Sequence, residues 1–138
     1  SYVIIDTTNI KVNTTHNFLK DPQDMYGPLS NYGIPYELGS MQHYSEKAFA
    51  VNRNRPTIYA KPAYSQYQYS MEAPRATFYD TLLVNKMYKC TDKCQTRIVC
   101  QNNGVQDGAN CNQCFCPKGW SGTHCERRPT GAQTVNIS

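Results

Sequence analysis

The first 89 residues combine short apolar runs with long polar stretches. Residues 2–5, Tyr-Val-Ile-Ile, form a β-branched run that predicts a buried strand ending at Asp6. Residues 56–59 predict a short edge strand, because a proline at its start donates no ladder hydrogen bond. Residues 20–40 are rich in Pro, Gly, Asn and Asp, and they predict irregular loops and turns. The pattern therefore predicts few regular elements.

Two further segments carry helical signals. Residues 45–50 predict a helical turn with Ala48 and Phe49 facing inward. Apolar residues later recur at three- and four-residue spacing and predict one amphipathic helix of about three turns, ending near Lys89; they are Phe78, Leu82, Leu83, Met87 and Tyr88. Thr77, followed three residues later by Asp80, is typical of a helix N-cap.

Tyrosines are concentrated just before this helix. Five lie in the segment from Tyr59 to Tyr79, at positions 59, 64, 67, 69 and 79. The favoured interpretation is packing with the hydroxyls in water, and a binding surface is the alternative.

Charge and composition exclude several function classes. The net charge is +4, from 14 Lys+Arg against 10 Asp+Glu, and the basic residues are scattered, which indicates a solvated surface and no nucleic-acid partner. No apolar run approaches the roughly 18 residues of a membrane span. The chain starts at Ser1 without a signal sequence, so we expect a processed or incomplete secreted protein. The sequons at Asn13 and Asn136 are candidate glycosylation sites.

All seven cysteines lie between Cys90 and Cys125, which favours an oxidising, extracellular compartment. Because the number is odd, one cysteine lacks a partner among the others. Six cysteines allow 15 connectivities, and the sequence alone does not choose among them. A zinc knuckle at Cys111, Cys114 and Cys116 is disfavoured, because the paired cysteine arms of such sites are missing.

The cysteine spacing resembles an EGF-like module over residues 94–125. The segment Cys-Phe-Cys-Pro-Lys-Gly-Trp-Ser-Gly-Thr-His-Cys, which ends at Cys125, carries the resemblance. Gly119 and Gly122 in it permit turn geometries that other residues avoid. The resemblance implies three disulfides, Cys94–Cys111, Cys100–Cys114 and Cys116–Cys125, and leaves Cys90 unpaired. A single acidic residue before Cys94 argues against a calcium site. Residues 126–138 are predicted to be a flexible tail.

Residues 31–49 resemble the Met-turn region of the astacin family of zinc metalloendopeptidases. They contain Pro-Tyr-Glu-Leu-Gly-Ser followed by Met-Gln-His-Tyr, where the family has Pro-Tyr-Asp-Tyr-Gly-Ser and Met-His-Tyr. The flanking strands and the helix before Cys90 fit the same family, and an EGF-like module after that cysteine is typical of nematode members. The implied fold is α+β and irregular. The resemblance also implies that residues 1–90 are the C-terminal half of a metzincin-type catalytic domain, mostly loop with short strands and one helix, and that the disulfide-rich module follows.

The resemblance assigns roles to the Met-turn residues. Tyr44 matches the zinc-proximal tyrosine that stabilises the oxyanion of the tetrahedral intermediate. Gln42 occupies the position of the family's apolar methionine, Met41 lies one residue early, and His43 is not a ligand in this match.

The family hydrolyses peptide bonds with a zinc-activated water, and its ligands form a His-Glu-x-x-His-x-x-Gly-x-x-His motif. This chain lacks the motif and has only His16, His43 and His124, so we expect no zinc bound by this chain and no activity of this chain alone. One hypothesis is a C-terminal fragment of a secreted protease acting on protein or peptide substrates, with the partner of Cys90 in the missing half. The alternative is a catalytically inactive secreted protein that binds extracellular partners through the EGF-like module. Signalling through that module alone is a weaker third hypothesis.

Overall fold

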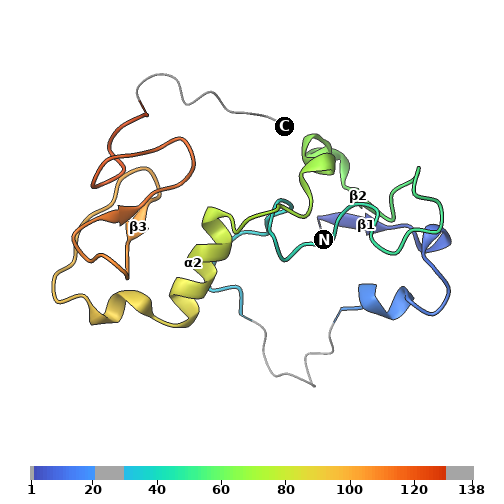
Figure 1. The fold of residues 1–138 in the computed structure, drawn as a ribbon, viewed down its shortest axis with the longest axis horizontal. Coiled ribbons are helices and arrows are strands. Elements are labelled where there is room, and N and C mark those ends of the chain that lie inside the picture. Colours follow the sequence, from blue (N-terminus) through green and yellow to red (C-terminus); the bar gives the residue numbers. More distant parts are fainter. Residues whose placement is uncertain (1, 21–29, 130–138) are drawn as a thin grey trace. The chain divides into compact units, whose positions relative to one another are not determined.

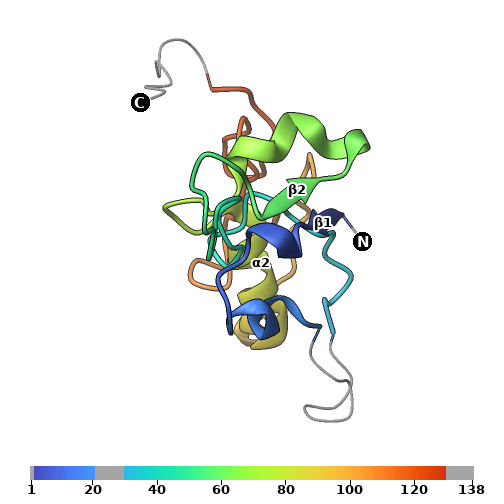
Figure 2. The same cartoon turned by 90° about the vertical axis from the view of Figure 1, so that its right-hand side faces the viewer.

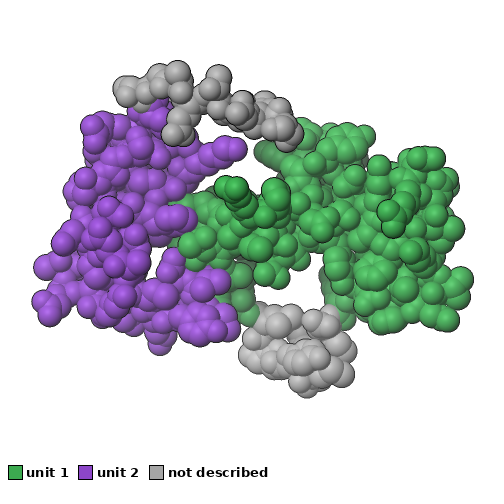
Figure 3. Space-filling model, in the orientation of Figure 1, with its two compact units in different colours: residues 1–83 green, residues 84–138 purple. Residues whose placement is uncertain are grey.

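The computed structural model describes residues 2–20 and 30–129. Its contacts divide the chain into two compact units, residues 1–83 and residues 84–138 (Figure 3). The division falls within the helix α2 (Phe78–Met87). The domain limits expected from the sequence, 1–90 and 94–125, remain a prediction.

Unit 1 is built around a two-stranded antiparallel sheet. Strand β1 (Val3–Ile5) pairs with β2 (Ile58–Ala60), and Ile4 lies opposite Tyr59 (Figure 1). Both predicted strands thus form, with β2 starting two residues after the proline. The predicted burial of the first strand is wrong, because Ile4 is 52% exposed and Val3 and Ile5 are only partly buried. The side chain of Gln68 extends the pairing of β2, because it accepts from the Ala60 N–H at 2.7 Å and donates to the Ile58 carbonyl at 2.9 Å.

The core of unit 1 is small. Leu38, Ile58 and Met71 are buried together, and partly buried residues pack against them; these are Val3, Ile5, Phe18, Ala60 and Tyr64. Unit 1 also contains the 3₁₀ helices η1 (Thr7–Asn9), η2 (Thr15–Phe18) and η3 (Pro62–Ser70), of which η2 and η3 contribute Phe18 and Tyr64 to the packing around the core. In Figure 2, η3 follows directly from β2. The sequence pattern did not predict η3, because its polar and tyrosine residues show no helical periodicity.

The predicted helical turn at residues 45–50 is instead a pair of hydrogen-bonded turns. The Ala48 N–H donates to the Ser45 carbonyl at 3.1 Å, and the Ala50 N–H donates to the Lys47 carbonyl at 3.1 Å. Phe49 has a φ of 57°, a left-handed conformation that ends helical geometry. Ala50 then forms an isolated bridge with Ile10.

The predicted helix is confirmed as α2. Thr77 and Asp80 form a reciprocal cap at its start, because the Asp80 N–H donates to the Thr77 hydroxyl at 3.1 Å and the Thr77 N–H donates to an Asp80 carboxylate oxygen at 3.0 Å. Lys89 has a φ of 51°, and this left-handed residue closes the C-terminal end. None of the α2 residues is fully buried, although the sequence pattern predicted an apolar face.

Unit 2 contains three disulfides and little regular structure. The bonds join Cys94 to Cys111, Cys100 to Cys114, and Cys116 to Cys125. Cys90 is the free cysteine of the described chain. A 3₁₀ helix, η4 (Cys90–Lys93), precedes a short hairpin of β3 (Val105–Gln106) and β4 (Cys114–Phe115).

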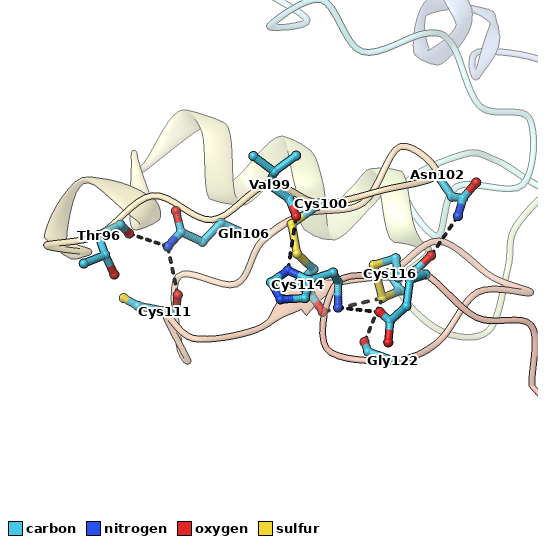
Figure 4. The surroundings of a disulfide bond; sticks show 12 residues. Thr96, Val99, Cys100, Asn102, Gln106, Cys111, Cys114, Cys116 and Gly122 are labelled. Carbon is cyan, nitrogen blue, oxygen red and sulfur yellow. Dashed lines mark hydrogen bonds between the residues drawn. A yellow bond between two sulfur atoms is a disulfide. The ribbon is translucent and has the colours of Figure 1, made fainter.

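Polar side chains complete unit 2. Gln106 is buried, and its amide donates to the carbonyls of Thr96 at 2.8 Å and Cys111 at 2.9 Å (Figure 4). Gly119 and Gly122 have φ values of 88° and 96°, which is the kind of turn geometry expected for them from the sequence.

The end of unit 2 holds the first residues of the predicted tail. Arg127 exchanges backbone hydrogen bonds of 2.8 and 3.0 Å with Ser121, and the Arg128 guanidinium lies 4.0 Å from the centre of the Trp120 ring. The rest of that tail, with the sequon at Asn136, lies outside the described residues.

Candidate functional site

A cleft of about 420 Å³ opens in unit 1 beside the sheet. Its apolar wall is formed by side chains from the strands, η2, the Met-turn match (residues 31–49) and α2. They are Val3, Ile5, Phe18, Ile34, Ile58 and Leu83. Its polar rim comes mainly from the Met-turn match and α2, through Glu37, Ser40, Gln42, His43, Tyr44 and Asp80. Residues far apart in the sequence thus meet in one cavity.

Tyr44 lines this cleft with its ring held by two phenylalanines. The ring centres of Phe18 and Phe49 lie 5.8 and 5.6 Å from that of Tyr44, in tilted and edge-on arrangements. Tyr44 is nevertheless 45% exposed. The packing fixes the ring and leaves part of the side chain accessible, as a hydrogen-bond donor to a bound molecule requires.

His43 orients the backbone of Tyr44. Its Nδ1 atom lies 2.6 Å from the Tyr44 carbonyl oxygen, and its Nε2 atom lies 2.6 Å from the Tyr36 hydroxyl. Because a carbonyl oxygen only accepts, the hydrogen-bond network assigns the proton of the neutral ring to Nδ1. The Tyr36 hydroxyl therefore donates to Nε2, and burial raises the pKa of Tyr36.

Gln42 and Met41 take different positions around the cleft. Gln42 contributes to the lining, whereas Met41 is 45% exposed and is absent from the lining residues. An amide therefore stands where the family match has an apolar methionine. Met41 contributes its backbone N–H, which donates to an Asp80 carboxylate oxygen at 3.0 Å.

Asp80 ties the Met-turn match to α2. Besides Met41 and the Thr77 cap, it accepts the Ser40 hydroxyl at 2.5 Å. Partial burial acts to raise the pKa of Asp80, but hydrogen bonds from Ser40, Thr77 and Met41 outweigh burial and lower this pKa below its ordinary value. Sequence reasoning assigned Asp80 only the role of a helix cap, because its contact with Ser40 spans 40 residues.

Asp80 is expected to make unit 1 acid-sensitive. Since the folded-state pKa is lowered, the stabilisation is complete above the ordinary value of 3.8 and is lost as pH falls through the lower folded value. We expect Asp80→Asn to cost about 1 kcal/mol at neutral pH, and this cost should shrink at an acidic pH, once the pH has fallen below 3.8 through the lowered folded value. Chemical denaturation at both pH values measures it, with Glu72→Gln, an exposed carboxylate of the same unit, as control. A cost in stability that is equal at both pH values would contradict the stabilising role of the ionised Asp80 carboxylate.

The described residues do not form a zinc site. No group of three or more His, Cys, Asp or Glu side chains in residues 2–20 and 30–129 is arranged to hold a metal ion. His16 is exposed, His43 bonds with Tyr36 and Tyr44, and His124 faces the Val99 carbonyl at 3.1 Å in unit 2. The side chains present in the described chain therefore do not fit a catalytic zinc ion.

Two other expectations concern the surface. Asn13 is exposed, with a φ of 64°, and its glycosylation stays a prediction. No helix among the described residues is long and apolar enough to cross a membrane.

Comparison with known proteins identifies the family. The astacin family of peptidases matches residues 1–89. The chain is 40% identical over 134 residues to zinc metalloproteinase nas-28 of Caenorhabditis elegans, and the match covers 95% of the chain and 26% of that protein. It is 35% identical over 128 residues to zinc metalloproteinase dpy-31 of the same organism, covering 91% of the chain and 20% of that protein. The chain thus spans about a fifth to a quarter of the length of these curated relatives.

A solved structure agrees with these matches. High choriolytic enzyme 1, a hatching enzyme zinc-protease from Oryzias latipes, superposes with a TM-score of 0.53 at 25% identity. The match covers 64% of this chain and 40% of the fish protein. The chain therefore belongs to the astacin family of zinc-dependent metallopeptidases.

Proposed function

We propose that the chain is the C-terminal part of a secreted astacin-like zinc metalloendopeptidase, with the zinc-binding helix encoded upstream of Ser1. The observation that carries this proposal is the placement of Tyr44 in the cleft, half-exposed and held through its ring and backbone. Its phenol donates a hydrogen bond to the oxyanion that forms when water attacks a peptide carbonyl. Substrates are proteins or peptides.

Residues 94–125 act as an EGF-like module in this proposal. The support is their disulfide pattern, first to third, second to fourth and fifth to sixth among the six bonded cysteines, together with a single short hairpin. Such a module suits an extracellular protein, because disulfides replace a core that so short a segment does not bury.

One observation favours a second candidate function. Gln42 places an amide in the cleft where the family match has methionine, which suits a catalytically inactive astacin-like protein that binds extracellular partners through the EGF-like module. The coding sequence upstream separates the two candidates. The protease requires a His-Glu-x-x-His-x-x-Gly-x-x-His motif whose last histidine lies within about a dozen residues of Ser1. An initiator methionine and signal peptide directly before Ser1 would instead support the inactive protein.

Tyr44→Phe tests the catalytic role in the longer protein. We expect kcat on a peptide substrate to fall about a hundredfold with little change in KM, because the lost hydrogen bond is made only in the transition state. Tyr69→Phe is the matched control, since Tyr69 is 86% exposed and does not line the cleft. Steady-state kinetics measures both variants, and a Tyr44→Phe enzyme with unchanged kcat would remove Tyr44 from the mechanism.

A further inference from the structure

Unit 1 contains a second cavity, of about 390 Å³, whose lining is mostly tyrosine. The lining includes Tyr2, Tyr36, Tyr64, Tyr67 and Tyr79, together with Glu37. Three of these six residues, Tyr36, Glu37 and Tyr79, also line the cleft that contains Tyr44. A peptide that occupies the cleft can therefore place a side chain in this second cavity, which we call the tyrosine pocket.

The rings of the tyrosine pocket are held by one another. Tyr2 stacks on Tyr36, with ring centres 4.7 Å apart and planes at 2°, and Tyr64 lies 5.2 Å from Tyr2 at 51°. The rings remain accessible, because Tyr2, Tyr36 and Tyr67 are 37%, 46% and 48% exposed. Aromatic faces carry the negative part of the ring quadrupole, so a preformed set of tyrosines attracts cations.

Glu37 makes the tyrosine pocket negative. Among the described residues that line the pocket it is the only charged one, although the chain as a whole carries a net charge of +4. One carboxylate oxygen, Oε2, accepts the Thr77 hydroxyl at 2.5 Å, which orients the group. In the described chain Glu37 forms no ion pair, so its charge is available to a ligand.

We infer that the tyrosine pocket binds the side chain of an arginine in a peptide ligand. The planar guanidinium suits both parts of the pocket, because it stacks on aromatic faces and donates to a carboxylate at the same time. Lysine binds more weakly, since a compact ammonium ion does not stack. This inference rests on the proposed function, and it names arginine-containing peptides as the substrates.

Binding to the chain itself tests the inference without any proteolysis. The probes are acetyl-Ala-Arg-Ala-amide and its citrulline counterpart, which is a neutral isostere, titrated into the isotope-labelled chain and followed by NMR. We expect saturable shifts at the pocket tyrosines with a Kd of about 1 mM for the arginine peptide. The citrulline peptide should bind at least about tenfold more weakly, because it loses the charge but keeps the shape.

Glu37→Gln should weaken binding of the arginine peptide about tenfold and leave binding of the citrulline peptide unchanged. Glu72→Gln removes the same charge outside the two cavities and should change neither affinity. Equal affinities for the arginine and citrulline peptides, or equally tight binding of acetyl-Ala-Pro-Ala-amide, would show a merely apolar surface and overturn the inference. If the chain binds the arginine peptide but the longer protein shows no proteolysis, the proposed protease function is refuted and the tyrosine pocket is retained as an arginine site. If the longer protein cleaves peptides but the chain does not bind the arginine peptide, only the arginine site in the tyrosine pocket is refuted.

Discussion

Removing the Cys94–Cys111 disulfide is expected to unfold unit 2 at physiological temperature. The bond links residues separated by 17 positions, and the loss of a loop constraint of this size costs about 3 kcal/mol. Unit 2 has little to offset this cost, because the buried apolar residues of its described part are three of its own cysteines, Cys94, Cys114 and Cys125. Without a hydrocarbon core, a unit of this size depends on its covalent links.

The variant is Cys94→Ala with Cys111→Ala, so that no new free thiol remains. NMR spectra of the whole chain should lose the dispersed signals of residues 94–125 and keep those of unit 1. Cys90→Ala is the matched control, because Cys90 is the free cysteine of the described chain and alanine keeps its Cβ atom. A double variant that melts within a few degrees of the wild type would show that unit 2 has another source of stability.

Local patterns in the sequence predicted where the regular elements form, although they did not predict the long-range pairing of Val3 with Ala60. Helix α2 follows from a cap and an apolar periodicity within a dozen residues, and the two strands of unit 1 follow from β-branched runs. Cysteine spacing implied, through a family resemblance, the three disulfides that the structure contains. Each of these signals is carried by residues that are close neighbours in the chain.

The candidate site depended on contacts that no local pattern contains. The cleft joins residues from Val3 to Leu83, and Ser40 reaches Asp80 across 40 positions. The sequence identified Tyr44 through its Met-turn match, but it did not place Phe18 beside that ring or His43 between two tyrosines. For the tyrosine cluster the sequence favoured simple packing. The structure divides that cluster, since Tyr64, Tyr67 and Tyr79 line a pocket while Tyr69 is 86% exposed.

The sequence also did not predict that Asn9 is buried at the centre of a polar network. The two N–H groups of its side-chain amide are shared among three carbonyls, those of Asn52, Arg55 and Pro56, at N···O distances of 3.1, 2.9 and 3.3 Å. Its carbonyl oxygen accepts the Asn52 N–H at 2.9 Å, and the residue is only 2% exposed. One side chain thus closes the loop that leads from the Met-turn match into β2.

Asn9→Ala is expected to destabilise unit 1 by about 3 kcal/mol, because it removes the hydrogen bonds of a buried amide and leaves part-buried backbone groups without partners. Asn9→Asp distinguishes hydrogen bonding from shape. The carboxylate has the same size but places negative charge against three carbonyl oxygens, so its cost at neutral pH should be at least as large and should shrink as acid protonates it. Asn54→Ala, at an exposed position of the same loop, should change stability by less than about 0.5 kcal/mol. Urea denaturation measures all three variants, and an Asn9→Asp protein as stable as the wild type at neutral pH would show that the amide donates to none of these carbonyls.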